Sequence, residues 1–326
     1  MPLRSLLLTI AVMISIPLSG SHLLLAAEQT PDIPTWLRAH VGTGEGQIAP
    51  VVLKRARALY RRKVDEGAVK NPCYFAMDAT RPSTSRSGRL GRRFYIICEA
   101  DKSFRAISSG YGNGRKLRRA NFSNGRRCAK NFSNAEGSNL TAGGVYMTAE
   151  TRESFKGYYR HSGKKTPFLR TFLPFVGEGD TANAWERAIG GHQAVGLRRR
   201  CRYKNPGSPY ADEEGYVPYG KLVNYTSGRS NGCTTWSPSD SKKIIAMVRD
   251  NPTTLYIYPE SGDIDAVAKA VKDRKSLSRA GLYWNSTCLQ AIRSPKFWPK
   301  ETLQPIIDEW RDSLPRGPRR PLPICK

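Results

Sequence analysis

Runs of apolar and polar residues divide this chain into a helical beginning, a strand-rich middle and a helical end. Between residues 49 and 67, apolar side chains recur at helical spacing among arginines and lysines, which predicts an amphipathic helix. Runs rich in aromatic and β-branched residues follow, separated by polar loops, as is typical of strands that pair with their neighbours along the chain. The predicted strands cover residues 73–78, 93–100, 104–110, 143–150, 187–196 and 253–259.

A further helix is predicted directly before the last of these strands. Ser237 is its expected N-cap, Pro238 occupies the first helical position, and Asp240 completes the spacing of a capping box. These three residues together indicate where the helix begins.

Long polar stretches separate the predicted strands. Residues 111–142 predict a long functional loop, residues 197–227 a polar insertion, and residues 151–182 only short β pieces. Helix formers and then a proline-rich tail make up residues 263–326. The sequence therefore predicts a mostly β fold with mixed and antiparallel sheets, a few helices, and helical appendages at both ends.

The first residues have the layout of a secretory signal peptide. Arg4 is the only charged residue before Glu28, and leucine, isoleucine, valine and alanine dominate the stretch between them. Cleavage is expected near Ser21 or near Ala27, so residues 1–27 are assigned to the signal. A retained membrane anchor is the alternative, because about 20 apolar residues can span a bilayer. The expected location is the periplasm or cell envelope of a bacterium, with no transmembrane span once the signal is removed.

The charge of the chain is strongly positive. Lysine and arginine supply 53 charges against 27 acidic ones, so the net charge is +26. Such a field implies an anionic partner, which is a nucleic acid, an acidic membrane surface or an anionic envelope polymer, or else it only keeps the protein soluble. Export favours the envelope polymer. No nucleic acid is expected, because the chain contains no recognisable nucleic-acid-binding module.

The chain contains seven cysteines, and this odd number is informative about disulfides. In an oxidising compartment cysteines pair, and an odd number leaves one free. No two of them have the short spacing of a zinc or redox site, and the chain has only 4 histidines, so no metal is expected. Three disulfides and one free thiol are the natural expectation. The cysteines are Cys73, Cys98, Cys128, Cys201, Cys233, Cys288 and Cys325.

Cys233 has the surroundings of a nucleophile. The preceding Gly232 leaves room for a substrate carbonyl, and backbone N–H groups at such a turn can hold a developing oxyanion. The helix that begins near Pro238 is expected to favour a thiolate through its N-terminal dipole. A thiol nucleophile also needs a base, and His192 follows a predicted strand 41 residues upstream. Taken alone, this pair is weak evidence for catalysis and fits a disulfide-bonded cysteine and a surface or packed histidine better.

Three collinear blocks strengthen the catalytic interpretation. They are FSNAEGSNLTAGGVYMT at 132–148, RAIGGHQA at 187–194 and GRSNGCTTW at 228–236. Together they resemble the YkuD-type L,D-transpeptidases, in particular the branch called the murein L,D-transpeptidase catalytic domain family. The resemblance covers about residues 72–259 and implies a catalytic domain over 72–262, a helical segment over 28–71 and a C-terminal extension over 263–326.

The resemblance also implies roles for individual residues. It places the nucleophile on Cys233 and the catalytic base on His192. Gly232, Ser230 and Asn231 are expected to support the turn and the oxyanion. Tyr146 and Arg229, which lie inside the matched blocks, are expected to bind substrate; no metal and no organic cofactor is implied.

Several positions depart from the family pattern. Gly190 and Gly191 replace the apolar pair that usually precedes the histidine, and Gln193 replaces the glycine that follows it. The interval between His192 and the nucleophile is lengthened by the insertion that carries Cys201. These departures leave the nucleophile and the base in place and put substrate preference and activity in question.

If Cys233 is free, the other six cysteines can form three disulfides, and sequence alone does not choose among fifteen connectivities. The set expected here is Cys73–Cys98, Cys128–Cys201 and Cys288–Cys325.

The resulting hypothesis is an exported cysteine L,D-transpeptidase that acts on peptidoglycan stem peptides through a thioester acyl-enzyme. Hydrolysis of that thioester, in an L,D-carboxypeptidase or endopeptidase, is the nearest alternative. A non-catalytic basic protein that binds the cell envelope is the alternative from a different class.

Overall fold

The structure is a computed structural model that describes residues 33–84, 90–161, 164–194, 201–204, 206–207, 211–219, 229–314 and 324–325. The predicted signal peptide lies outside the described residues. Residues 34–326 form one compact unit, so the segments expected to be N- and C-terminal appendages belong to the same body as the strands. Within the described residues, no helix has both the length and the apolar character that a membrane span requires.

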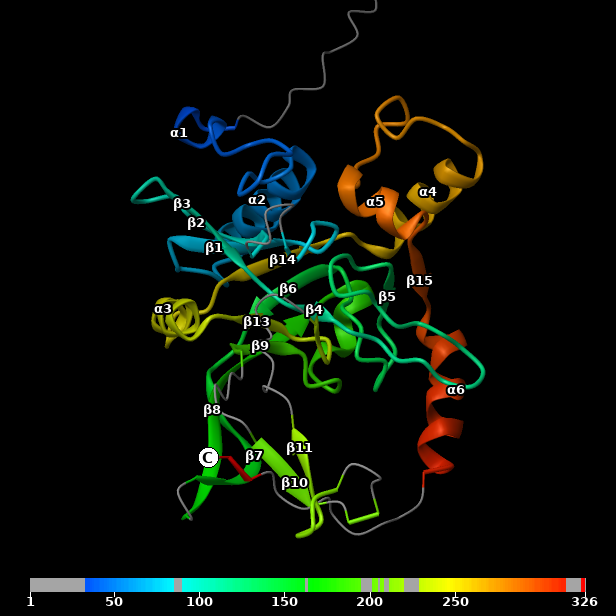
Figure 1. The fold of residues 1–326 in the computed structure, drawn as a ribbon. Helices are drawn as coiled ribbons and strands as arrows, with labels where there is room; N and C mark the ends of the chain where they lie inside the picture. The colour runs from blue at the N-terminus through cyan, green and yellow to red at the C-terminus, as the bar shows by residue number, and fades with distance from the viewer. Residues whose placement is uncertain are drawn as a thin grey trace, which may run out of the picture. The chain divides into compact units, whose positions relative to one another are not determined.

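The centre of the fold is a mixed β-sheet (Figure 1). β1 (Cys73–Asp78) pairs in parallel with β14 (Thr254–Tyr258) and antiparallel with β2 (Arg92–Cys98). Every residue of β1 and β14 is buried, because elements cover both faces of these strands. On one face, α2 (Pro50–Asp65) buries an apolar stripe, as its helical spacing predicts. On the other, α3 (Pro238–Val248) contributes Ile244, Ile245 and Val248 to the main core.

The sheet continues on both sides of this centre. β3 (Ser103–Ser108) lies at the edge beside β2, and β6 (Gly144–Thr148) joins β14 to the long strand β8 (Lys164–Gly177). β7 (Arg152–His161) and β8 form an antiparallel hairpin, so the prediction of only short β pieces over 151–182 is wrong. β8 also pairs with β9, and β9 with β13, which makes a side branch of the sheet; the bounds are β9 (Gly190–Gln193) and β13 (Thr234–Trp236).

The polar insertion carries two further strands at the far end of the β7–β8 hairpin. β10 (Cys201–Lys204) pairs with β11 (Tyr216–Tyr219) and with β16 (Ile324–Cys325), and β16 pairs with β7. The C-terminal end of the chain is therefore part of the sheet.

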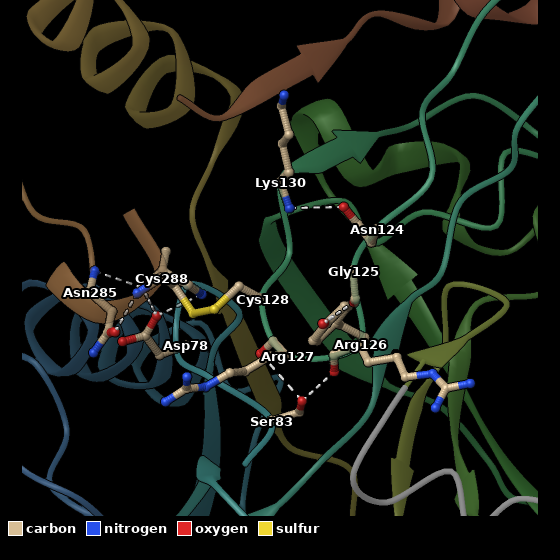
Figure 2. The surroundings of a disulfide bond; sticks show 12 residues. Asp78, Ser83, Asn124, Gly125, Arg126, Arg127, Cys128, Lys130, Asn285 and Cys288 are labelled. Atoms are coloured by element: carbon tan, nitrogen blue, oxygen red, sulfur yellow. Dashed lines mark hydrogen bonds between the residues drawn. A yellow bond between two sulfur atoms is a disulfide. The ribbon is translucent and has the colours of Figure 1, made fainter. Parts of the chain in front are cut away.

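The long polar loop is held by segments that are distant in sequence. Within it, β4 (Tyr111–Gly112) pairs with β12 (Arg229–Ser230), and β5 (Asn131–Ser133) pairs with β15 (Lys296–Trp298). The Asn124 side chain makes four hydrogen bonds to the backbone of Gly112, Lys130 and Asn131, so its amide is fully satisfied although it is buried. Figure 2 shows the bond that Asn124 accepts from Lys130.

The remaining helices are α1 (Thr35–Arg38), the 3₁₀ helix η1 (Gly179–Ala184), α4 (Ser261–Lys272), α5 (Ser286–Ile292) and α6 (Lys300–Asp312). The last three lie in the C-terminal segment that was expected to be an extension. They add Ile264, Val267 and Cys288 to the main core, and Leu303 and Ile307 to a smaller cluster over the polar loop.

The disulfides confirm one of the three expected pairs. Cys73 and Cys98 are bonded, as their positions on neighbouring strands predicted. The expected pairs Cys128–Cys201 and Cys288–Cys325 are wrong, because Cys128 is bonded to Cys288 (Figure 2). The reason lies in the strand pairing: β5 runs beside β15, which brings the loop that carries Cys128 against α5. Cys201 and Cys325 are register partners in β10 and β16, and their side chains lie outside the described part of the chain.

A buried arginine next to the sheet gives a prediction about stability. Arg93 is fully buried at an irregularity between β2 and β3, its three guanidinium nitrogens have no hydrogen-bond partner, and its charge lies 4.7 Å from the centre of the Tyr111 ring. Burial lowers its pKa, because desolvation disfavours the charged form. We expect Arg93→Met to raise the free energy of unfolding in urea by about 1–4 kcal/mol, since replacing a buried charge with an apolar side chain of similar volume removes the desolvation penalty.

Arg92→Met is the matched control for this experiment. Arg92 is half exposed and lies 3.6 Å from Glu45, and such surface pairs contribute about 1 kcal/mol at most. A loss of stability in Arg93→Met larger than that in Arg92→Met would contradict the prediction and would assign the buried guanidinium a stabilising role.

Candidate active site

The pairing of β9 with β13 places the predicted base on one strand and the predicted nucleophile directly before its neighbour. The two strands are parallel, with Thr235 opposite His192 and Thr234 opposite Gly191. Cys233 is the residue directly before β13, so it lies two positions before Thr235, the residue opposite His192. Cys233 and His192 are therefore offset by two residues along neighbouring strand segments. The imidazole and the thiol can together span such a diagonal separation.

The tautomer of His192 follows from its hydrogen bond. Nδ1 lies 2.7 Å from the backbone carbonyl oxygen of Gln193. A carbonyl oxygen only accepts, so Nδ1 carries the proton and donates it to this bond. In the neutral ring Nε2 is then the nitrogen with a lone pair, and it is the atom that can accept a proton. His192 is buried at 5% exposure, and its ring lies 6.3 Å from that of Phe172, which restricts the orientation of the imidazole.

Cys233 is a free thiol, as the odd number of cysteines predicted. It is 8% exposed, and its Sγ lies 3.7 Å from the carbonyl oxygen of Ala188. Ala188 has a φ of +51°, a region that non-glycine residues adopt at a cost. The chain before β9 therefore turns sharply beside the thiol.

The turn before Cys233 is held by Ser230. The Ser230 hydroxyl accepts a hydrogen bond from the Gly232 N–H at 3.2 Å and donates one to the carbonyl oxygen of Cys233. Gly232 has a φ of +107°, and a Cβ on it would lie 2.9 Å from Ile189 Cδ1 and 3.0 Å from the Leu140 carbonyl oxygen, so glycine is required here. Because the Gly232 N–H is satisfied inside the turn, its expected oxyanion role changes to a role in holding the turn.

The expected influence of the helix N-terminus on Cys233 is not supported. α3 begins at Pro238 with Ser237 as N-cap, as predicted, and the Ser237 hydroxyl accepts a hydrogen bond from the Asp240 N–H at 3.1 Å. However, β13 lies between the thiol and the helix, and five extended residues span roughly 16 Å. The effect of a helix dipole falls off within the first turn. Any stabilisation of a thiolate must therefore come from another group.

Tyr146 does not lie where a substrate-binding residue is expected. It is 1% exposed, and its hydroxyl donates to the Ala142 carbonyl oxygen at 2.8 Å. Burial raises the pKa of this hydroxyl, so it stays neutral at physiological pH. The prediction of a direct substrate contact is corrected, since Tyr146 supports the loop beneath the site from within the core.

The other two predicted residues lie around the rim of the turn. Asn231 is exposed, and its Oδ1 accepts from the Asn113 side-chain amide at 3.5 Å. The backbone of Arg229 pairs with Tyr111 in β12 and β4, and the side chain of Arg229 lies outside what the structure describes.

Sequence reasoning missed Arg187, although this residue opens the block that contains His192. Its Nη2 donates to the Leu140 carbonyl oxygen at 2.8 Å, the same oxygen that approaches Gly232. Arg187 also lines an open pocket of about 460 Å³. The lining combines two basic and two acidic side chains with an alanine and an asparagine: Arg187, Lys300, Glu136, Glu186, Ala182 and Asn183.

The glycines that depart from the family pattern are explained by packing. A Cβ on Gly191 would lie 1.9 Å from Cη2 of Trp236, and a Cβ on Gly190 would lie 2.3 Å from the Leu173 carbonyl oxygen. Trp236 is fully buried and packs edge-on against Phe94 at 5.3 Å between ring centres. The indole ring therefore fills the space that a side chain at position 191 would need.

Gly191→Ala is expected to lower the free energy of unfolding by about 3 kcal/mol, because the methyl group overpacks a core that cannot move aside. The matched control is Gly262→Ala, where a Cβ meets no atom within 4 Å and the helix α4 favours alanine. That variant is expected to be neutral or stabilising by up to about 1 kcal/mol. Urea unfolding monitored by tryptophan fluorescence measures both, and equal effects would refute the packing explanation.

Compared with known proteins, the chain matches no family model, no curated protein and no solved structure. The assignment of a function therefore rests on the three sequence blocks and on the chemistry of the site around Cys233.

Proposed function

We propose that this protein is an exported cysteine acyltransferase that acts on peptidoglycan stem peptides, as an L,D-transpeptidase does. The observation that carries the proposal is the free thiol of Cys233 at the start of β13, the strand that pairs with β9, which carries His192; Nδ1 of His192 is engaged by a backbone carbonyl. A thiol, a base and a group that orients the base are what nucleophilic catalysis by cysteine requires. Two disulfides in the described residues are compatible with an oxidising compartment.

The reaction would run in two halves. In the first, Nε2 of His192 takes the proton of Cys233, and the thiolate attacks the carbonyl carbon of an L-centre in a stem peptide. A C–S bond forms, the amide C–N bond breaks, and the terminal D-residue leaves as an amine after receiving the proton from His192. In the second half, an amine of another stem peptide attacks the thioester, a new amide C–N bond forms and the C–S bond breaks. His192 takes the proton that the amine loses and returns it to the sulfur of Cys233.

The open pocket beside Arg187 supports a peptide substrate with charged ends. Stem peptides carry free amines and carboxylates, and the pocket offers Lys300 and Arg187 to the carboxylates and Glu136 and Glu186 to the amines. The net charge of +26 supports a location beside anionic polymers of the envelope, which would keep the enzyme near its substrate.

Hydrolysis is the second candidate reaction at the same site. The acyl-enzyme would form in the same way, and water would then attack the thioester, so that the protein would be an L,D-carboxypeptidase or endopeptidase. Both reactions require Cys233 and His192, and they differ only in the group that accepts the acyl chain.

Incubation with purified muropeptides tests the proposal and separates the two reactions. Cross-linked dimers are the expected products of transfer, and shortened monomers alone are the product of hydrolysis. Intact-mass measurement should detect a thioester adduct on wild-type protein in either case. A non-catalytic envelope-binding protein would bind the polymer and give neither adduct nor product, and that outcome would end the catalytic proposal.

A further inference from the structure

A cysteine nucleophile is reactive as a thiolate, so a nearby positive charge changes its reactivity. The helix α3 does not supply that charge, because β13 separates its N-terminus from Cys233. Arg187 is another source of positive charge, and it directly precedes the sharp turn at Ala188.

Two contacts near the nucleophile define the position of Arg187. On one side, the guanidinium donates a hydrogen bond to the Leu140 carbonyl oxygen, which lies close enough to Gly232 that a Cβ on that residue would be 3.0 Å from it. On the other side, the Sγ of Cys233 contacts the carbonyl oxygen of Ala188, the residue next to Arg187. Arg187 therefore contacts Leu140 through its side chain and is joined through its backbone to Ala188, the residue whose carbonyl oxygen the thiol contacts.

The electrostatics agree with this geometry. Desolvation lowers the pKa of Arg187, and its interactions with Tyr146, Cys233 and Glu136 act in the opposite direction. Arginine nevertheless remains charged at physiological pH. Tyr146 is neutral there, so the negative charges that interact with Arg187 are a Cys233 thiolate and the Glu136 carboxylate. Glu136 is half exposed and also lies 3.4 Å from Arg311, so solvent and a second arginine share its charge.

We propose that Arg187 is a positioning residue for the nucleophile: its charge stabilises the Cys233 thiolate and lowers the pH at which Cys233 becomes reactive. This inference rests on the proposed function in one respect, that Cys233 is the nucleophile. Besides Arg187, the Tyr146 hydroxyl from β6 interacts with the charge of Cys233, and His192 lies on the neighbouring strand β9. The positive charge of Arg187 favours the thiolate form of Cys233 over the neutral thiol.

The rate of alkylation of Cys233 by iodoacetamide, measured as a function of pH and assigned to Cys233 by peptide mapping, tests this inference. In Arg187→Gln the midpoint of the profile is expected to rise by about one pH unit, so the rate at pH 7 falls about tenfold. The plateau at high pH is expected to match that of wild type, because the thiolate is equally accessible. Arg187→Lys, which keeps the charge, is expected to retain most of the wild-type rate at pH 7.

Two further variants keep the test decisive. Lys243→Gln removes one charge from an exposed position on α3 and is expected to leave the profile unchanged. Glu136→Gln removes the carboxylate that competes for Arg187, and the rate at pH 7 is expected to rise about twofold even if Arg187→Gln does not fold. A profile for Arg187→Gln that coincides with wild type, or a lowered plateau with an unchanged midpoint, would overturn the inference.

The outcome is separable from that of the proposed function. A shifted alkylation profile without any adduct or product from muropeptides would support the role of Arg187 and refute the peptidoglycan reaction. Turnover of muropeptides with no difference in the alkylation profile would do the reverse.

Discussion

Cys233→Ala is expected to reduce the conversion of muropeptides at least about 10⁴-fold, because the thioester intermediate cannot form without the sulfur. His192→Gln is expected to lose about 10²–10⁴-fold, since it removes the base and keeps the nucleophile. Product formation measured by liquid chromatography, with intact-mass detection of the acyl-enzyme, provides both values. The acyl-enzyme should be absent from the alanine variant and should form slowly in the glutamine variant.

The fold of the Cys233→Ala variant serves as the control. Cys233 is in no disulfide, so the alanine variant should unfold in urea within about 1–2 kcal/mol of wild type, the cost of deleting one small buried group. Full activity in the folded alanine variant would refute the proposed mechanism. A conversion that depends on His192 and not on Cys233 would assign the reaction to a different nucleophile.

Removal of the Cys128–Cys288 disulfide has the second large expected effect. The two cysteines are 160 residues apart, and the chain-entropy estimate for closing such a loop is about 5 kcal/mol. Both are buried, Cys128 at 4% and Cys288 at 0% exposure. We therefore expect the double variant Cys128→Ala, Cys288→Ala to lose about 3–5 kcal/mol in the free energy of unfolding. Urea unfolding under non-reducing conditions measures this loss.

The Cys73–Cys98 disulfide is the matched comparison. It closes a separation of only 25 residues between neighbouring strands, for which the same estimate is about 3.5 kcal/mol. Its double alanine variant should therefore lose less stability. It should also leave the packing of α5 intact, which protection of the α5 amides against hydrogen exchange reports. A larger loss on removing Cys73–Cys98 would contradict the assignment of Cys128–Cys288 as the main covalent constraint.

Much of the secondary structure could be predicted from the sequence. The range of β1 was predicted to the residue, and α2 and β14 were predicted within one or two residues, because each is a strongly patterned segment of its own. The N-cap at Ser237 was also predicted, from a local hydrogen-bond signature, and the odd count of cysteines predicted one free thiol, which is Cys233.

The site shows where local patterns stop being informative. Tyr146 and Arg187 both lie in blocks that resemble a known family, and sequence alone assigned a role to Tyr146 and none to Arg187. In the structure, Tyr146 is enclosed in the core, whereas Arg187 donates a hydrogen bond to the Leu140 carbonyl oxygen, close to Gly232. Which side of a segment faces the site depends on the strands that pack against it.

The sequence by itself determined several strands and the capped helix, because each depends on residues that are close together in the chain, and it singled out Cys233 as the candidate nucleophile. Tertiary structure alone decided the partner of Cys128 and the position of Arg187. These features depend on the order in which strands pair, and strand order is selected by the packing of the whole core. A local sequence pattern therefore does not predict strand order.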